Sequence, residues 1–189
     1  MAGASLKVGE KVVVEAQDFQ KLLDVLSSKG YQSVGPTLSY GDLVYDEISS
    51  VADLPVGWTD EQEGGTFRLK PRGDKALFGY AVGQKSWKQF LLPPRELIWQ
   101  AKHKGEGFKV TPRNEAAPKY AFIGVHACDL SAIQVQDKVY LEGKFVEPTY
   151  KSRRAQALIV AVNCSQPCGT GFCASMGAGP KAASGYDVA

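Results

Sequence analysis

Cysteine is the residue type in this sequence best suited to metal chemistry. Three of the four cysteines, Cys164, Cys168 and Cys173, fall within ten residues, and the fourth is Cys128. Four thiolates are enough for one [4Fe–4S] cluster or one tetrahedral zinc ion. No Cys-x-x-Cys pair occurs, which excludes a thioredoxin-type redox site, and the spacings fit structural zinc only loosely. Buried free thiols are the remaining interpretation.

The segment that holds the three clustered cysteines is poor in residues that build a core. Residues 164–189 contain no leucine and no isoleucine, and they contain five glycines. Such a segment buries too little apolar surface to order itself, whereas a bound metal centre would supply free energy of folding. Glycines also let backbone amides approach the sulfur atoms of a cluster. The composition therefore favours a metal centre.

Three weaker signals have ordinary explanations. His126 lies two residues before Cys128, so a Cys–His nucleophilic site is conceivable, but a histidine at a strand end more often serves packing. The pattern over residues 177–182 resembles a dinucleotide-binding fingerprint, yet it contains a proline and follows no strand. The basic residues in 151–154 could dock an acidic partner or a phosphate, and a solvated helix end is the commoner reason for them.

The elements that position the cysteines are the most regular part of the sequence. Residues 120–125 and 157–162 are continuous apolar runs, typical of strands buried on both faces. Asp129 can cap a helix between them, which predicts a parallel strand–helix–strand unit. The carboxyl ends of both strands then lie at one edge of the sheet, where ligands of α/β proteins gather. Cys128 and Cys164, just past these ends, are predicted to be neighbours.

The rest of the chain predicts an α/β or α+β fold, a mixed sheet with flanking helices. We expect a helix from Asp18 to Gly30, on the 3.6-residue spacing of its leucines. Strands are expected over residues 11–15, 38–48, 66–69 and 96–101, and loops over residues 60–63 and 102–118. We expect one domain over residues 1–189, with a β-rich part (1–85), an α/β part (86–163) and a Cys/Gly-rich loop and tail (164–189).

Composition excludes several classes of protein. The 189 residues are 44% hydrophobic and 22% charged, with a net charge of only +2, so no nucleic-acid partner is expected. The longest apolar runs are about six residues, far short of the roughly 20 that cross a membrane. The first residues lack the apolar core of a signal peptide. We therefore expect a cytoplasmic protein, where structural disulfides are rare.

A set of motifs, taken together, makes the sequence recognisable. The chain resembles the beta (iron–sulfur) subunit of sulfhydrogenase-type [NiFe] hydrogenases, and the corresponding iron–sulfur subunit of anaerobic sulfite reductase is similar. The resemblance spans roughly residues 10 to 189. Its motifs lie at residues 91–96, 124–130, 137–139, 150–154 and 163–180.

The resemblance implies an electron-transfer subunit that is not itself catalytic. It would relay electrons between a partner that binds flavin and NAD(P)H and the catalytic subunit of a hydrogenase or sulfite reductase. Cys128, Cys164 and Cys173 match cysteine positions of the family, whereas Gly171 stands where the family has a further cysteine. Cys168 is then the expected fourth ligand of a [4Fe–4S] cluster.

A second departure concerns length. Members of the family continue into a ferredoxin-like domain with two further cysteine runs, and this sequence contains none, so it is expected to correspond to the N-terminal part alone. The alternative function is a subunit-interaction module that is metal-free or stabilised by zinc.

Overall fold

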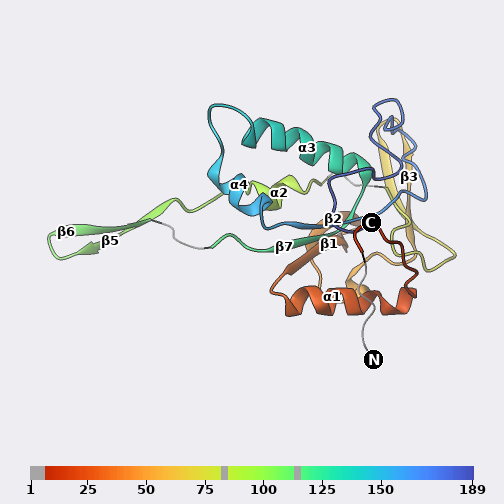
Figure 1. The fold of residues 1–189 in the computed structure, drawn as a ribbon, viewed down its shortest axis with the longest axis horizontal. Coiled ribbons are helices and arrows are strands. Elements are labelled where there is room, and N and C mark those ends of the chain that lie inside the picture. The colour runs from red at the N-terminus through yellow and green to blue at the C-terminus, as the bar shows by residue number, and fades with distance from the viewer. Residues whose placement is uncertain (1–6, 82–84, 113–115) are drawn as a thin grey trace.

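A mixed four-stranded sheet forms the centre of the molecule (Figure 1). The computed structural model describes residues 7–81, 85–112 and 116–189. The strand order is β2-β1-β7-β8, with β1 Gln32–Ser39, β2 Asp42–Glu47, β7 Tyr120–Val125 and β8 Leu158–Ala161. β1 and β2 are antiparallel, whereas β7 is parallel to both β1 and β8. The predicted α/β class with a mixed sheet is confirmed.

Helices cover both faces of this sheet (Figure 1). α1 (Phe19–Ser28) lies on one face, and α2 (Lys88–Leu91), α3 (Ala127–Leu141) and α4 (Pro148–Arg154) lie on the other. β7 supplies both cores, because alternate side chains of a strand point to opposite faces. Ile123 belongs to the core of α1 with Leu23, and Phe122 belongs to the core of α3 with Leu130. This double burial explains the continuous apolar run of β7.

The predicted strand–helix–strand unit is confirmed. β7 and β8 pair in parallel, with Ala121 opposite Leu158, and α3 and α4 lie between them in the chain. The ladder is irregular at Gly124, which has φ +85°, and a Cβ there would lie 2.7 Å from Cε1 of Phe78. Glycine is thus required both by backbone conformation and by space. α3 begins at Ala127, so Cys128 lies in its first turn rather than in a loop.

Two hairpins extend from this centre. The first joins β3 (Trp58–Glu63) to β4 (Thr66–Pro71), and the second joins β5 (Trp99–Lys104) to β6 (Gly107–Pro112). Residues 60–63 and 102–118 were predicted to be loops. That prediction is wrong for residues 60–63, 102–104 and 107–112, which belong to strands. Residues 113–115 lie outside the described residues. Pairing of backbone groups in these hairpins leaves most side chains in solvent, so polar sequence is compatible with strand.

The remaining strand predictions hold in part. The strand expected over residues 11–15 is wrong, because Val12 to Val14 lie exposed with no strand beside them among the described residues. The strand expected over residues 38–48 is two strands, separated by a turn in which Tyr40 and Gly41 both have positive φ. The strand expected over 66–69 is confirmed as β4, and the one over 96–101 begins only at Trp99.

The predicted first helix is confirmed as α1, preceded by the short helix η1 (Ala16–Asp18). Its buried residues are Leu23 and Leu26, and Gly30 follows its end with φ +78°. A second short helix, η2 (Val51–Asp53), lies between β2 and β3. Among the described residues, no helix combines the length and apolar character needed to span a bilayer.

The tail returns to the sheet instead of leaving it. Val188 forms a parallel bridge with Val160 of β8, and the Asp187 carboxylate accepts the backbone N–H of Ile159 at 2.8 Å. Ala182 is buried in the core of α3, and its backbone N–H donates to the side-chain oxygen of Asn163 at 2.9 Å. Contacts within the protein therefore hold a segment that the sequence predicted to need a metal.

Candidate metal centre

Cys128 occupies the first turn of α3, where it is half-buried and free. Burial raises the pKa of its thiol to about 12, and the neighbouring Asp129, Cys164 and Cys168 act in the same direction. The interaction energy of two charges falls with the distance between them. The charges of Cys164 and Cys168 therefore disfavour the thiolate form of Cys128.

The loop cysteines also lie near one another. Burial raises the pKa of Cys164, with added contributions from Cys168 and Cys173. Burial likewise raises the pKa of Cys168, helped by Asp60 and Cys173. Each thiolate would be destabilised by its neighbours, which is the electrostatic environment that a bound cation reverses.

Gly179 joins the end of this loop to α3. A Cβ at Gly179 would lie 3.3 Å from Cβ of Ala127 and 3.8 Å from Sγ of Cys173. The backbone N–H of Cys164 donates to the carbonyl of Pro180 at 3.1 Å, which closes the loop on itself. Cys173 is thereby held beside the first turn of α3, the turn that carries Cys128.

The β3–β4 hairpin holds the other side of the loop. Thr170 Oγ1 donates to Gln62 Oε1 at 3.1 Å, and Thr59 Oγ1 donates to Gln166 Oε1 at 3.3 Å. Gly169 packs against β3 so closely that a Cβ would lie 2.5 Å from the Gln62 carbonyl oxygen. The loop between Cys164 and Cys173 is therefore seated on this hairpin by polar side chains and by one glycine.

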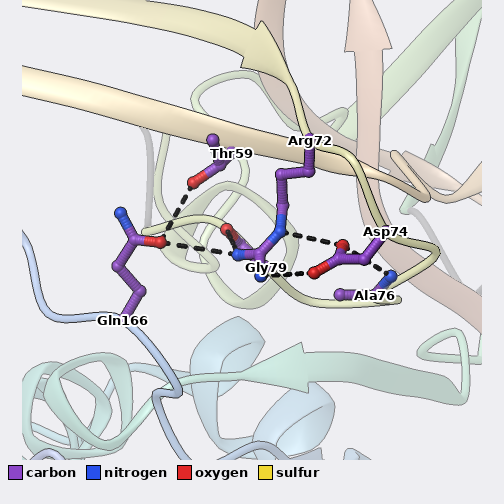
Figure 2. Close-up of polar contacts among 6 residues, drawn as sticks. All are labelled: Thr59, Arg72, Asp74, Ala76, Gly79 and Gln166. Carbon is purple, nitrogen blue, oxygen red and sulfur yellow. Dashed lines mark hydrogen bonds and ion pairs between the residues drawn. The ribbon is translucent and has the colours of Figure 1, made fainter.

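Arg72 extends the same network, as Figure 2 shows. Its Nη1 donates to Gln166 Oε1 at 3.4 Å and to the Gly79 carbonyl at 3.1 Å. Asp74 fixes the guanidinium with two bonds of 2.9 and 2.7 Å, and this pairing lowers the pKa of Asp74. Gln166, from the cysteine loop, thus reaches a rigid arginine at the end of the hairpin (Figure 2).

The four cysteines have side chains of the kind that bind zinc and iron–sulfur clusters. Their positions in this structure do not form a coordination sphere. In the described ranges, no three histidine, cysteine, aspartate or glutamate side chains form a group that could hold a metal ion as they stand. Thiolate is the ligand of both zinc and iron–sulfur clusters. Of the four cysteines that the sequence singled out, Cys128 lies in the first turn of α3 and Cys173 lies beside that turn.

Asp129 caps α3, as predicted, but from the third position of a capping box and not as the N-cap residue itself. His126 is the N-cap of α3, and Asp129 lies three residues later, where its Oδ2 accepts the His126 backbone N–H at 3.4 Å. The same oxygen accepts from Trp87 Nε1 at 3.2 Å and from the Tyr45 hydroxyl at 3.5 Å. Burial raises the pKa of Asp129 to about 6 despite these donors. Asp129 therefore ties the Cys128 turn to β2 and α2.

Asp60 is a buried carboxylate that sequence reasoning missed. Its Oδ1 accepts the backbone N–H of Ala81, and the residue is 7% exposed. Its charge acts to raise the pKa of Cys168 and also that of His126. No local sequence pattern predicts this burial. Asp60 belongs to β3, and residues distant in the sequence cover the inward face of that strand.

A Cys–His nucleophilic site is not supported by the surroundings of His126. The side chain is 3% exposed, burial lowers its pKa to about 4, and its Nδ1 has no hydrogen-bond partner within the described ranges. A nucleophilic cysteine needs a lowered pKa, whereas the pKa of Cys128 is raised. His126 is chiefly a core histidine.

The basic stretch of residues 151–154 also serves the fold. Arg153 donates to the Phe90 carbonyl at 2.9 Å, and Arg154 Nε lies 3.1 Å from Asp137 Oδ1. These two arginines are thus engaged inside the protein, whereas Lys151 is exposed. The interpretation as a helix end is favoured over a phosphate site.

The fold and the gathered thiols together define a mixed α/β module with a cysteine-rich edge. Over 101 residues, 53% of its length, the chain is 35% identical to the protein named sulfhydrogenase 2 subunit beta from Pyrococcus furiosus. The matched part is 28% of that relative, so the chain spans less than a third of its length. The similarity confirms the predicted resemblance. No family model matches the chain, and no solved structure matches it.

Proposed function

We propose that this chain is the electron-transfer portion of a hydrogenase or sulfite-reductase-like complex. In this proposal, Cys128, Cys164, Cys168 and Cys173 hold one [4Fe–4S] cluster. The observation that carries it is the approach of the loop after β8 to the first turn of α3, where a Cβ at Gly179 would lie 3.3 Å from Cβ of Ala127 and 3.8 Å from Sγ of Cys173. The name of the Pyrococcus furiosus relative supports the kind of complex.

Cys168 is the proposed fourth ligand. The resemblance implies a cysteine at position 171, where this chain has glycine. A Cβ on residue 171 would lie 2.8 Å from Cβ of Cys168 and 3.6 Å from its Sγ. The Cβ of Cys168 therefore occupies the space that a side chain at position 171 would need, and the Cys168 Sγ lies at an ordinary contact distance from that space. A cysteine at position 168 would therefore take the role of the cysteine implied at position 171, in the same part of the loop.

The chain would do three things for the cluster, whose chemistry when bound is the uptake and release of single electrons. The four cysteines would supply its ligands. The β3–β4 hairpin would fix the loop through Gln62, Thr59 and Arg72, which limits the motion of the ligands. Asp129, anchored by Trp87, would hold the α3 turn in place. Such supporting contacts set the orientation of metal ligands.

We assign the partners by the same reasoning. The chain would pass electrons between a partner that binds flavin and NAD(P)H and the catalytic subunit, in the cytoplasm, and would perform no catalysis itself. Its single cluster would be one step of a longer relay. The division of the chain into residues 1–85, 86–163 and 164–189 stays a prediction within this proposal.

The experiment that tests the relay compares two electron acceptors. The chain is expressed anaerobically together with the catalytic and flavin-binding subunits of the proposed complex, as wild type and as Cys128→Ser and Cys164→Ser. We expect hydrogen-dependent reduction of viologen at the catalytic subunit to persist in both variants, while reduction of NAD(P)⁺ falls at least tenfold. Unchanged reduction of NAD(P)⁺ would contradict the relay. Ser28→Ala, at an exposed position of α1 on the face of the sheet opposite α3, is the matched control.

A metal-free or zinc-stabilised interaction module is the second candidate. The specific observation in its favour is that protein contacts alone seat the loop, through Thr170 on Gln62 and Asn163 on Ala182. Under this proposal the chain assembles with partner subunits without iron. Metal analysis of the purified complex separates the two, since zinc near one per chain, or no metal at all, would favour this candidate.

A further inference from the structure

The β5–β6 hairpin is an arm that extends from the rest of the molecule. Figure 1 shows it projecting at one end, far from the cysteine loop. Every residue of both strands is exposed. A two-stranded hairpin that packs on nothing is marginally stable in water. The arm, defined as residues 99–112, is therefore an element that a partner would stabilise by covering it.

The register gives the arm two different faces. Paired residues of an antiparallel ladder share a face, and successive pairs alternate between faces. One face carries the pairs Trp99–Pro112, Ala101–Val110 and His103–Phe108. The opposite face carries the pairs Gln100–Thr111, Lys102–Lys109 and Lys104–Gly107. The arm is thus apolar and aromatic on one side and basic on the other, with both sides open to solvent.

The lysines of the basic face form no ion pair with the described residues. Lys102 and Lys109 stand directly opposite each other, and like charges in that position destabilise a hairpin. Neither these two lysines nor Lys104 forms an ion pair with any described residue. The arm therefore carries positive charge that an acidic surface would neutralise.

The apolar face continues into the root of the arm. Leu97 and Ile98 are 53% and 78% exposed, and Trp99, where the arm begins, is 57% exposed. A hollow of about 300 Å³ lies beside them, and Pro118 and Thr149 contribute to its wall. An apolar side chain from another molecule could enter this hollow while the arm is covered.

We propose that the arm inserts into a groove of a partner subunit of the same complex. The groove would be apolar where it meets Trp99, Phe108 and Val110, and would carry carboxylates where it meets Lys102 and Lys109. This inference rests on the proposed function only in assuming that the chain belongs to such a complex.

The dimensions of the arm argue against a second copy as the occupant. Six residues at about 3.4 Å each make a face about 20 Å long, and two strands about 5 Å apart keep it narrow. Two arms stacked through their apolar faces would bury on the order of 500 Å², below the roughly 1,200 Å² of a specific interface. A groove that encloses both faces of the arm buries a larger area than this stack and also contacts the lysines.

The charge distribution argues against a lipid surface. A membrane-bound amphipathic element places its basic residues beside its apolar face, where they reach the headgroups. In the arm the lysines occupy the opposite face, directed away from any membrane that the apolar face would enter. A protein groove that surrounds the arm satisfies both faces together.

The test measures binding of the full chain to its catalytic and flavin-binding subunits. Two arm variants are used, W99S/F108S for the apolar face and K102E/K109E for the basic face. Tyr40→Ser with Phe145→Ser is the apolar control, and Lys75→Glu with Lys138→Glu is the charge control, since all four positions are exposed elsewhere. We expect both arm variants to weaken binding at least about tenfold, and the controls to stay within twofold.

Three outcomes would overturn the inference. They are wild-type affinity in both arm variants, a dimer by light scattering that only W99S/F108S abolishes, and arm-dependent binding to vesicles with anionic lipid. Iron and sulfide content of the same preparations is measured in parallel. Loss of metal with normal arm dependence would count against the cluster alone, and full metal with no arm dependence would count against the arm alone.

Discussion

Cys168 lies in the space that a side chain on Gly171 would occupy, since a Cβ at Gly171 would be 2.8 Å from the Cys168 Cβ. The two positions therefore exclude each other as side-chain sites in this loop. Under the proposed function, this relationship makes Cys168 the substitute for the cysteine that the resemblance implies at position 171. It also makes the identity of the fourth ligand testable.

Exchanging the residues at positions 168 and 171 should preserve the proposed iron–sulfur centre. C168G/G171C moves the thiol three residues along the chain, onto a Cβ that would lie 2.8 Å from the present Cβ of Cys168, so we expect the iron content to stay near that of the wild type. Cys168→Gly alone removes the thiol and should lower the iron content by at least half. Iron per chain after anaerobic purification is the readout. Equal iron in wild type and Cys168→Gly would remove Cys168 from the ligand set.

Gly169 should be required for seating the loop. A Cβ there would lie 2.5 Å from the Gln62 backbone oxygen, and a strand backbone cannot retreat as a side chain does. We expect Gly169→Ala to lower the free energy of unfolding by about 1–3 kcal/mol, the usual cost of overpacking. Denaturant unfolding measures this cost. Gly64→Ala, with nothing within 4 Å of the new Cβ, is the control and should be nearly neutral; similar losses in both variants would refute the explanation.

Tyr150 should stabilise the contact between α3 and α4. Its buried hydroxyl donates to Asp137 Oδ1 at 2.7 Å, and Arg154 Nε binds the same carboxylate at 3.1 Å. Tyr150→Phe leaves the ring in place and removes one hydrogen bond, which should cost about 1 kcal/mol. Thermal and denaturant unfolding provide the measurement. Tyr186→Phe, in the exposed tail, should cost nothing measurable, and a neutral Tyr150→Phe would contradict the role given to this bond.

Asp53 should make stability depend on pH in the acid range. Its Oδ2 accepts the backbone N–H groups of Ser49 and Ser50, both at 2.8 Å, and these bonds lower its pKa below the ordinary 3.8. A carboxyl whose pKa is lower in the folded state stabilises the protein above its unfolded pKa. That stabilisation is lost as the pH falls through the folded pKa.

The variant Asp53→Asn isolates this contribution. It should lose about 0.5–1 kcal/mol at pH 7, as other capping residues do, and the difference from the wild type should shrink toward zero as the pH falls below 3.8 and through the lower folded pKa. Unfolding curves at several pH values test the expectation. A difference that stays constant from neutral pH into this acid range would show that the charge of Asp53 is not responsible.

The parts of the fold that were predicted correctly are those with a strong local pattern. β7 and β8 are continuous apolar runs because both faces are buried, and α1 shows a helical spacing of leucines because one stripe is buried. The strands β3, β5 and β6 were missed, wholly or in part, because antiparallel hairpins pair their backbones while most side chains stay in water. A polar strand then has the composition of a loop.

The candidate site, like the fold, could be predicted from the sequence only in part. The parallel arrangement of β7 and β8, whose carboxyl ends share an edge, is confirmed, and it is the basis on which Cys128 and Cys164 are predicted to be neighbours. The seat of the loop did not follow, because Gln62 and Thr170 are polar residues 108 positions apart with no local pattern that links them. The burial of Asp60 was not predicted for the same reason, since the backbone N–H that its Oδ1 accepts belongs to Ala81, 21 positions away.

The most direct test of the central claim is the iron and acid-labile sulfide content of the anaerobically purified chain. One [4Fe–4S] cluster held by the four cysteines predicts about four iron and four sulfide per chain, both lost when Cys128 or Cys164 is replaced by serine. A well-folded wild-type chain that contains neither iron nor sulfide would contradict the claim.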